Sequence, residues 1–179
     1  MRPGIKVMLT TTLLAVGTAA FVGASAQDLS YPLPDPSHIP FVVPDNIQWE
    51  GSAARGQQQF KIFGDPAKPG WYAILMKWYP GHFSKPHFHE HTRYVTVLSG
   101  HWWVSSSPVY DVNKTYPLPA GTIARDEANT VHWDGAKDEP VVLEIVGEGP
   151  APNIPVDENG KPLPPRQGRG EADETAPRQ

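Results

Sequence analysis

Residues 81–100, "GHFSKPHFHEHTRYVTVLSG", join a cluster of histidines to an alternating apolar segment and a glycine. Four of the chain's seven histidines fall between positions 82 and 91. In the segment that follows, Val95 and Val97 occupy one set of alternate positions, while Tyr94 and Leu98 occupy the other. This period of two residues is typical of a β-strand that buries one face. The stretch therefore predicts a strand whose leading end carries side chains able to bind a metal.

His87 and His89 have the spacing of two metal ligands on one strand. Side chains two residues apart on a strand project from the same face, so both imidazoles can reach one ion at about 2.0–2.1 Å. A His-x-His pair is weak evidence by itself, because ordinary surface strands also carry histidines. The surrounding sequence has to decide between a metal site and a polar strand edge.

The rest of the central sequence is typical of an all-β domain. Short runs rich in β-branched and aromatic residues are separated by turn residues, and no ten-residue stretch shows a capped helical period. We expect strands within residues 57–64, 70–80, 93–100, 101–107, 116–124, 130–135 and 140–147. The turn at Ser99 and Gly100 predicts a hairpin between residues 93–100 and 101–107. This pattern favours a β-sandwich or a β-barrel.

The histidines and residues further along the chain together resemble the two sequence motifs of the cupin superfamily. The first motif is matched by Gly81, His87, His89 and Gly100. The second is matched by "PLPAGTIARDEANTVHW", which contains Pro119, Gly121 and His132. The resemblance implies a small jelly-roll (cupin-type) β-barrel over residues 45–149.

The same resemblance implies that His87, His89 and His132 hold one divalent metal ion inside the barrel. Fe(II) is the favoured ion, with Cu, Mn, Ni and Zn as alternatives, because imidazole suits several of these metals. Three neutral imidazoles leave coordination positions open, which is the arrangement of catalytic rather than structural sites. The alternative is a cupin that has lost its metal and keeps the histidines as hydrogen-bonded residues of the pocket.

Arg93 stands where the cupin motif has a metal-binding glutamate. The six-residue spacing from Gly100 fixes this alignment, and a guanidinium cannot ligate a cation. If a metal binds at all, its fourth ligand is then His91, Glu90, Glu144 or water, or the three histidines hold it alone.

Two roles are open for Arg93 if it points into the barrel. We expect Arg93 and Glu144 to contribute to substrate binding, because a guanidinium can hold a substrate carboxylate with two hydrogen bonds. The alternative is an internal ion pair of Arg93 with Glu144, Glu90 or Asp126. Either way, a buried arginine requires an anionic partner.

These residues predict a metal-dependent oxidoreductase of the dioxygenase type, acting on a small organic acid or an aromatic compound. One alternative is a redox-neutral lyase or isomerase that uses the metal as a Lewis acid. Another is a non-catalytic ligand-binding or sensing protein, because fold does not fix function. The expected partners are a small anionic molecule and, as an open alternative, a second copy of the chain in a homodimer.

The two ends of the chain differ in composition from the centre. Residues 1–26 combine basic residues, an apolar stretch and "ASA" at 24–26, which predicts a signal peptide cleaved after Ala26. We therefore expect an exported protein, periplasmic or secreted, with no stable membrane insertion after cleavage. Residues 27–44 predict a proline-rich extended arm, and residues 150–179, rich in proline, glycine and charge, predict a disordered tail.

The composition excludes several classes of function. Without residues 1–26, 13 basic residues remain against 19 acidic ones, a formal charge of −6. No nucleic-acid partner is expected, because binding to phosphates requires a basic surface. The chain has no cysteine, which excludes disulfides and thiolate chemistry.

Overall fold

The structure, a computed structural model, describes residue 35 and residues 37–164. A compact unit begins at Val42 and is built almost entirely from strands. These are β1 (Glu50–Ser52), β2 (Gln57–Phe63), β3 (Gly70–Trp78), β4 (His82–Phe83), β5 (His87–Phe88), β6 (Arg93–Ser99), β7 (His101–Ser105), β8 (Tyr116–Pro119), β9 (Ile123–Asp126), β10 (Trp133–Ala136), β11 (Val141–Gly149) and β12 (Ile154–Pro155). Three short 3₁₀ turns, η1 (Pro44–Asn46), η2 (Ala53–Arg55) and η3 (Val112–Lys114), complete the described elements.

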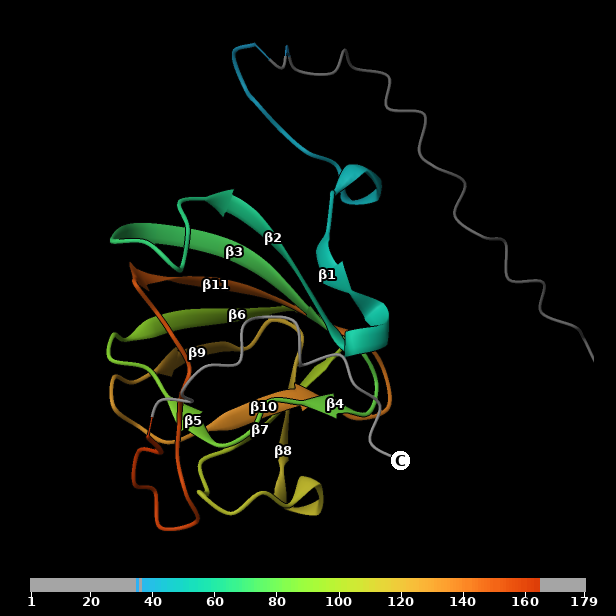
Figure 1. The fold of residues 1–179 in the computed structure, drawn as a ribbon. Coiled ribbons are helices and arrows are strands. Elements are labelled where there is room, and N and C mark those ends of the chain that lie inside the picture. The colour runs from blue at the N-terminus through green and yellow to red at the C-terminus, as the bar shows by residue number, and fades with distance from the viewer. Residues whose placement is uncertain (1–34, 36, 165–179) are drawn as a thin grey trace, which may run out of the picture. The chain divides into compact units, whose positions relative to one another are not determined.

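The strands form two facing sheets, as Figure 1 shows. One sheet has the order β1-β2-β3-β11-β6-β9, the other has the order β4-β10-β7-β8, and β5 pairs with β12. All of these pairs are antiparallel. The chain is thus the all-β jelly-roll barrel that the sequence predicts.

The core lies between the sheets and is centred on β11. Val141, Leu143 and Ile145 alternate with less buried residues along this strand and are at most 6% exposed. Val95 and Val97 of the neighbouring β6 point to the same side and are equally buried, which confirms the alternation expected for this strand. Their burial removes apolar surface from water, at about 25 cal/mol per Å², and joins the two sheets.

The predicted hairpin around Gly100 is wrong. β6 pairs with β11 and β9 in the six-stranded sheet, whereas β7 pairs with β10 and β8 in the other. Gly100 therefore marks the point where the chain crosses from one sheet to the other. It has φ +73°, and a Cβ added there would lie 2.3 Å from the Pro140 carbonyl oxygen, so this crossing requires glycine.

A second ladder of backbone hydrogen bonds positions the histidine cluster. His82 and Phe83 of β4 pair with Ala136 and Gly135 of β10, respectively. The Ser84 N–H continues this pairing by donating to the Asp134 carbonyl at 2.8 Å. After the interruption at residues 85–86, His87 and His132 form a further antiparallel bridge. The chain from residue 82 to residue 87 thus runs alongside residues 132–136.

The prediction of a disordered tail over residues 150–179 needs a correction for its first half. β12 pairs with β5, and the Val156 N–H donates to the Pro86 carbonyl at 3.1 Å. The Val156 side chain is 7% exposed. Two apolar residues, Ile154 and Val156, are sufficient here because β5 offers unpaired backbone groups to this segment. Residues 165–179 lie outside the described residues.

The predicted signal peptide also lies outside the described residues, as do residues 27–34 and 36 of the predicted arm. The described part of the arm contains a turn in which the Asp35 carboxylate accepts hydrogen bonds from the Ser37 N–H and hydroxyl. Across the described chain, no helix has the length and apolar character needed to cross a membrane.

Truncation of the C-terminal segment tests its structural role. Ending the chain after Gly149 removes β12 and the buried Val156, so we expect the free energy of unfolding to fall by about 2 kcal/mol or more. Ending it after Pro164 retains both and should leave the free energy unchanged. Urea denaturation followed by tryptophan fluorescence measures the difference, and equal stability of the two truncated proteins would contradict a structural role.

Candidate metal centre

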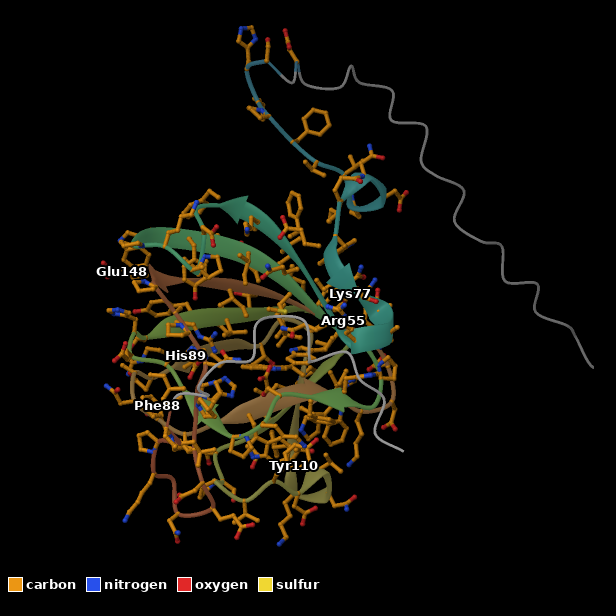
Figure 2. All side chains as sticks on the ribbon, in the orientation of Figure 1. Arg55, Lys77, Phe88, His89, Tyr110 and Glu148 are labelled. Carbon is orange, nitrogen blue, oxygen red and sulfur yellow. The ribbon has the colours of Figure 1, made fainter. Side chains whose placement is uncertain are left out.

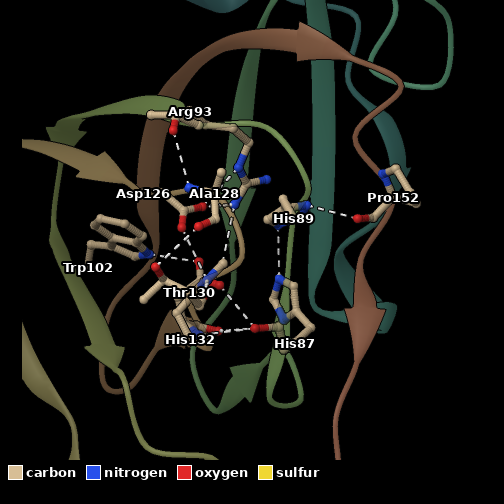
Figure 3. Close-up of polar contacts among 12 residues, drawn as sticks. His87, His89, Arg93, Trp102, Asp126, Ala128, Thr130, His132 and Pro152 are labelled. Atoms are coloured by element: carbon tan, nitrogen blue, oxygen red, sulfur yellow. Dashed lines mark hydrogen bonds and ion pairs between the residues drawn. The ribbon is translucent and has the colours of Figure 1, made fainter. Parts of the chain in front are cut away.

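The structure brings His87, His89 and His132 together (Figure 3). His87 lies on β5, His89 follows that strand, and His132 immediately precedes β10. The backbone N–H of His87 donates to the His132 carbonyl at 3.0 Å, and the reverse bond is 2.8 Å long. One ring nitrogen from each histidine lies within 4.8 Å of the others. Strand pairing therefore places a residue over forty positions away beside the His-x-His pair.

Each imidazole is oriented by a backbone carbonyl. The Nδ1 atoms of the three rings lie 2.7–3.0 Å from the carbonyl oxygens of Lys85, Pro152 and Thr130, respectively. A carbonyl only accepts hydrogen bonds, so each neutral ring is assigned its proton at Nδ1 and presents an unprotonated Nε2. This is the orientation in which metal-bound histidines are commonly held.

Burial keeps two of the rings uncharged. His87 is 4% exposed and His89 is 1% exposed. Desolvation, followed by the charge of Arg93, lowers the pKa of His89 to about 2. Desolvation and the neighbouring His132 lower the pKa of His87 as well. Both rings are therefore neutral at physiological pH, as metal binding requires.

The geometry of these rings fits a divalent metal. The Nε2 atoms of His87 and His89 lie 3.1 Å apart. Two lone pairs at this distance repel each other unless a cation or a proton lies between them. Burial opposes a proton on either ring, whereas a metal ion satisfies both nitrogens and reaches His132 as well. Imidazole donors of this kind suit iron, copper, nickel and zinc.

Arg93 forms an ion pair inside the barrel rather than facing an empty pocket. The register of β6 and β9 sets Arg93 directly opposite Asp126. Its Nε donates to Asp126 Oδ2 at 2.9 Å, and Nη2 contacts the same oxygen. The two side chains are 15% and 9% exposed. Of the two roles open for Arg93, the structure shows the internal ion pair.

This ion pair also contacts the third histidine. Asp126 Oδ1 lies 3.1 Å from His132 Nδ1, so the carboxylate supports the ring together with the Thr130 carbonyl. Arg93 Nη2 lies 3.4 Å from His132 Nε2, the nitrogen that would bind a metal. A positive group thus stands beside the centre where the cupin motif has a negative ligand.

Glu144, for which a substrate-binding role was predicted, does not face the centre. Glu144 lies between Leu143 and Ile145 on β11, whose side chains point into the core, so alternation directs Glu144 to the outer face of the sheet. Among the described residues, neither Glu90 nor His91 joins the three-histidine cluster. The structure therefore provides no fourth ligand from any of the three residues that the sequence suggested.

Asp134 is a half-buried carboxylate that sequence analysis missed. Its Oδ2 accepts hydrogen bonds from the indole N–H groups of Trp78 at 3.1 Å and Trp102 at 2.7 Å. Its Oδ1 accepts one from the Ser84 hydroxyl at 3.0 Å. Trp78 is on the six-stranded sheet and Trp102 on the four-stranded one, so this carboxylate ties the two sheets together. Alternation along residues 132–136 is the one sequence signal that could have indicated it.

Two cavities adjoin the centre. One, of about 610 Å³, contacts His132 and has an apolar wall formed by Trp102, Val104 and Leu118 beside charged residues such as Arg125 and Asp126. The other, of about 560 Å³, contacts His87 and is more polar, with Arg55 and Lys85 in its wall. Asp134 borders both. A small organic molecule can therefore approach His132 from one cavity and His87 from the other.

Two histidines outside this group, His82 and His101, have local roles. The His82 ring packs against Gly56, where an added Cβ would lie 2.1 Å from it, and its Nδ1 contacts the Pro80 carbonyl. The exposed His101 pairs with Glu139 on the surface. Both therefore lie outside the metal centre.

The Arg93–Asp126 pair provides a test with a matched control. Asp126→Asn leaves the largely buried guanidinium without a charged partner, so we expect the free energy of unfolding to fall by roughly 3 kcal/mol. Glu127→Gln removes an exposed partner of Arg125 and should cost less than about 1 kcal/mol. Urea denaturation measures both, and equal losses would show that burial does not strengthen the inner pair.

The lowered histidine pKa values predict how the stability of the metal-free protein depends on pH. Below about pH 6.5, His87 and His89 become protonated in the unfolded chain but stay neutral in the folded protein. Stability should thus be complete above pH 6.5 and fall as the pH drops towards the folded pKa of His89, about 2. We expect His89 to contribute a loss of roughly 2 kcal/mol between pH 6.5 and 4.5. Chelator-treated protein is unfolded in urea at each pH to obtain the free energy of unfolding. In His89→Gln this free energy should depend less steeply on pH. An identical pH dependence would contradict a lowered pKa of His89.

Comparisons with known proteins identify the fold. No family model matches the chain, and no curated protein matches its sequence. The polyketide cyclase RemF from Streptomyces resistomycificus superposes with a TM-score of 0.51 at 18% identity, covering 67% of this chain and 88% of that one. KdgF from Halomonas sp. gives 0.47 at 19% identity, covering 61% and 93%. An RmlC-like cupin from Shewanella frigidimarina gives 0.48 at 14% identity, covering 62% and 92%. The chain has the fold of the cupin superfamily.

Proposed function

We propose that this protein is a metal-dependent enzyme that acts on a small organic molecule at the three-histidine centre. The observation that carries the proposal is the convergence of one ring nitrogen from each of three histidines, with the Nε2 atoms of the two buried rings 3.1 Å apart and no carboxylate in the group. Such a donor set leaves coordination positions free, which is typical of catalytic metal sites. Dioxygenase-type oxidation is the first reaction class to test.

A bound redox-active metal such as Fe(II) would supply a centre at which an organic substrate and dioxygen can react. The residues of the chain contribute orientation and enclosure. The carbonyls of Lys85, Pro152 and Thr130 hold the rings, while the Asp126 carboxylate supports the His132 ring from its outer side. The apolar wall around Trp102 limits water next to His132.

The two cavities favour an amphipathic substrate. The larger cavity would receive an aromatic or apolar portion against Trp102 and Leu118. Because Asp126 already satisfies Arg93, an anionic group is better placed in the other cavity, near Arg55 and Lys85. The carboxylate of Asp134 in that wall is compensated by three hydrogen-bond donors. A small organic acid with an aromatic or apolar body meets both requirements.

A second candidate is a metal-free ligand-binding protein. It is favoured by one specific contact, the approach of Arg93 Nη2 to within 3.4 Å of His132 Nε2. A guanidinium at this nitrogen competes with a metal for its lone pair. In that case the histidines and the Arg93–Asp126 pair would form a polar pocket for a ligand.

Metal content and oxygen consumption separate these candidates. The protein is produced with each of Fe, Mn, Ni, Cu and Zn and analysed for bound metal. We expect about one ion per chain, and at least a tenfold loss of affinity in His89→Gln, because two ligands cannot replace three. His101→Gln, on the exposed surface, is the control and should keep the metal.

Oxygen uptake with a panel of small organic and aromatic acids then tests the reaction class. Turnover with oxygen consumption supports the dioxygenase type, and turnover without it indicates a redox-neutral enzyme. A folded protein that binds none of these metals would overturn the enzyme proposal and leave the ligand-binding one.

A further inference from the structure

A row of four residues crosses the inner face of the six-stranded sheet and ends beside His132. Strand register pairs Gly147 of β11 with Tyr72 of β3 on one side and with Arg93 of β6 on the other. It also sets Arg93 opposite Asp126 of β9. All four positions belong to the inward-facing set of their strands, because they alternate with the outward residues. The Arg93–Asp126 pair is therefore one half of a longer row that begins at Tyr72.

This row borders the apolar core on one side. The next inward row is made only of apolar residues, which strand register joins as Ile74, Ile145, Val95 and Ala124. On the other side lie the histidines, since Figure 2 shows Glu148, which follows Gly147, at the same end of the barrel as His89. A guanidinium in the row cannot move deeper into the barrel, because it would lose its hydrogen bonds among apolar side chains.

Tyr72 and Gly147 together shape the place that Arg93 occupies. Tyr72 is 1% exposed, and its hydroxyl accepts a hydrogen bond from the Arg93 guanidinium. A Cβ added at Gly147 would lie 3.0 Å from the Tyr72 hydroxyl oxygen and 3.1 Å from Arg93 Cγ. Both distances are shorter than an ordinary van der Waals contact, so a larger residue at position 147 would push the two side chains apart. Glycine at this position is what lets Tyr72 and Arg93 meet across β11.

The guanidinium of Arg93 is fixed by contacts on several sides. Asp126 accepts hydrogen bonds from its Nε and Nη2, Tyr72 accepts another, and Nη2 lies 3.4 Å from His132 Nε2 (Figure 3). The Asp126 carboxylate approaches the opposite side of the His132 ring, with Oδ1 3.1 Å from Nδ1. Asp126 balances the charge of Arg93, yet the positive group is the one next to the nitrogen that would bind a metal.

We propose that Tyr72 is a positioning residue of the centre. Across the space left by Gly147, it holds the Arg93 guanidinium against His132 and thereby weakens the binding of a divalent metal at the three histidines. A cation that is held on several sides cannot withdraw from an arriving metal ion, so the two positive charges repel each other at close range. The effect on metal affinity rests on the proposed metal centre, whereas the positioning of Arg93 by Tyr72 does not.

A double-mutant cycle on metal affinity tests whether Tyr72 acts through Arg93. Isothermal titration calorimetry with Zn²⁺ compares the metal-free wild type, Tyr72→Phe, Arg93→Gln and the double variant. We expect Tyr72→Phe to tighten binding about fivefold, because the cation becomes free to turn away, and Arg93→Gln to tighten it roughly tenfold or more, because the cation is absent. The double variant should bind no more tightly than Arg93→Gln alone.

Two further variants make this test specific. Tyr94→Phe changes the exposed neighbour of Arg93 on the outer face of β6, so it is the control and should leave the affinity unchanged. Gly147→Ala pushes Tyr72 away from Arg93 and should tighten binding only when Arg93 is present. An unchanged affinity in Tyr72→Phe would overturn the proposal, as would an equal gain with and without Arg93. Circular dichroism of each variant identifies a loss of folding.

The unfolding equilibrium keeps the positioning role testable without a metal. If none of these proteins binds the metal, the proposed function fails, and urea denaturation of the same four proteins decides the role of Tyr72. We expect the effects of Tyr72→Phe and Arg93→Gln on the unfolding equilibrium constant to depart from additivity by about threefold or more. Additive effects would show that Tyr72 does not hold Arg93 and would overturn the positioning role.

Discussion

The structure of the centre depends on one electrostatic constraint, the approach of two buried, unprotonated imidazole nitrogens to 3.1 Å. Burial lowers the pKa of both rings, so protonation does not relieve the repulsion easily. The carbonyls that hold Nδ1 of His87 and His89 come from different parts of the chain, residues 85 and 152, and prevent the rings from turning away. The fold thus holds a donor set together against its own repulsion, which a cation would remove.

Arg93 changes the charge balance of this centre. A glutamate ligand would bring a negative charge to a divalent ion, whereas here the positive Arg93 stands beside His132 and its charge is balanced by Asp126. An ion held by three neutral imidazoles keeps its full charge, which strengthens its attraction for an anionic substrate or for hydroxide. Weaker metal binding and stronger polarisation of a ligand would therefore have the same origin, the replacement of a carboxylate by Arg93.

Much of the centre could be predicted from the spacing of residues along the sequence. The two-residue spacing of His87 and His89 gave their shared direction, and the cupin-like spacing gave His132 and the position of Arg93. The sequence suggested three acidic residues, Glu90, Asp126 and Glu144, as possible ion-pair partners of Arg93. It could not identify Asp126 among them, because that pairing depends on the register of β6 with β9. The orientation of Glu144 could not be predicted for the same kind of reason, since the face of β11 that it occupies is set by packing and not by its spacing from the histidines.

The C-terminal segment shows why composition alone was misleading. Residues 150–156 are rich in proline and poor in large apolar residues, yet the Pro152 carbonyl orients His89 and Val156 is buried. A proline has no N–H to donate, but its carbonyl remains a good acceptor, so a proline-rich segment can orient a ligand without forming regular structure. Such a segment needs only a neighbouring strand to pair with, and β5 supplies it. The same strand therefore carries one histidine of the centre and fixes the segment that orients the next histidine, which couples the order of the C-terminal segment to the geometry of the centre.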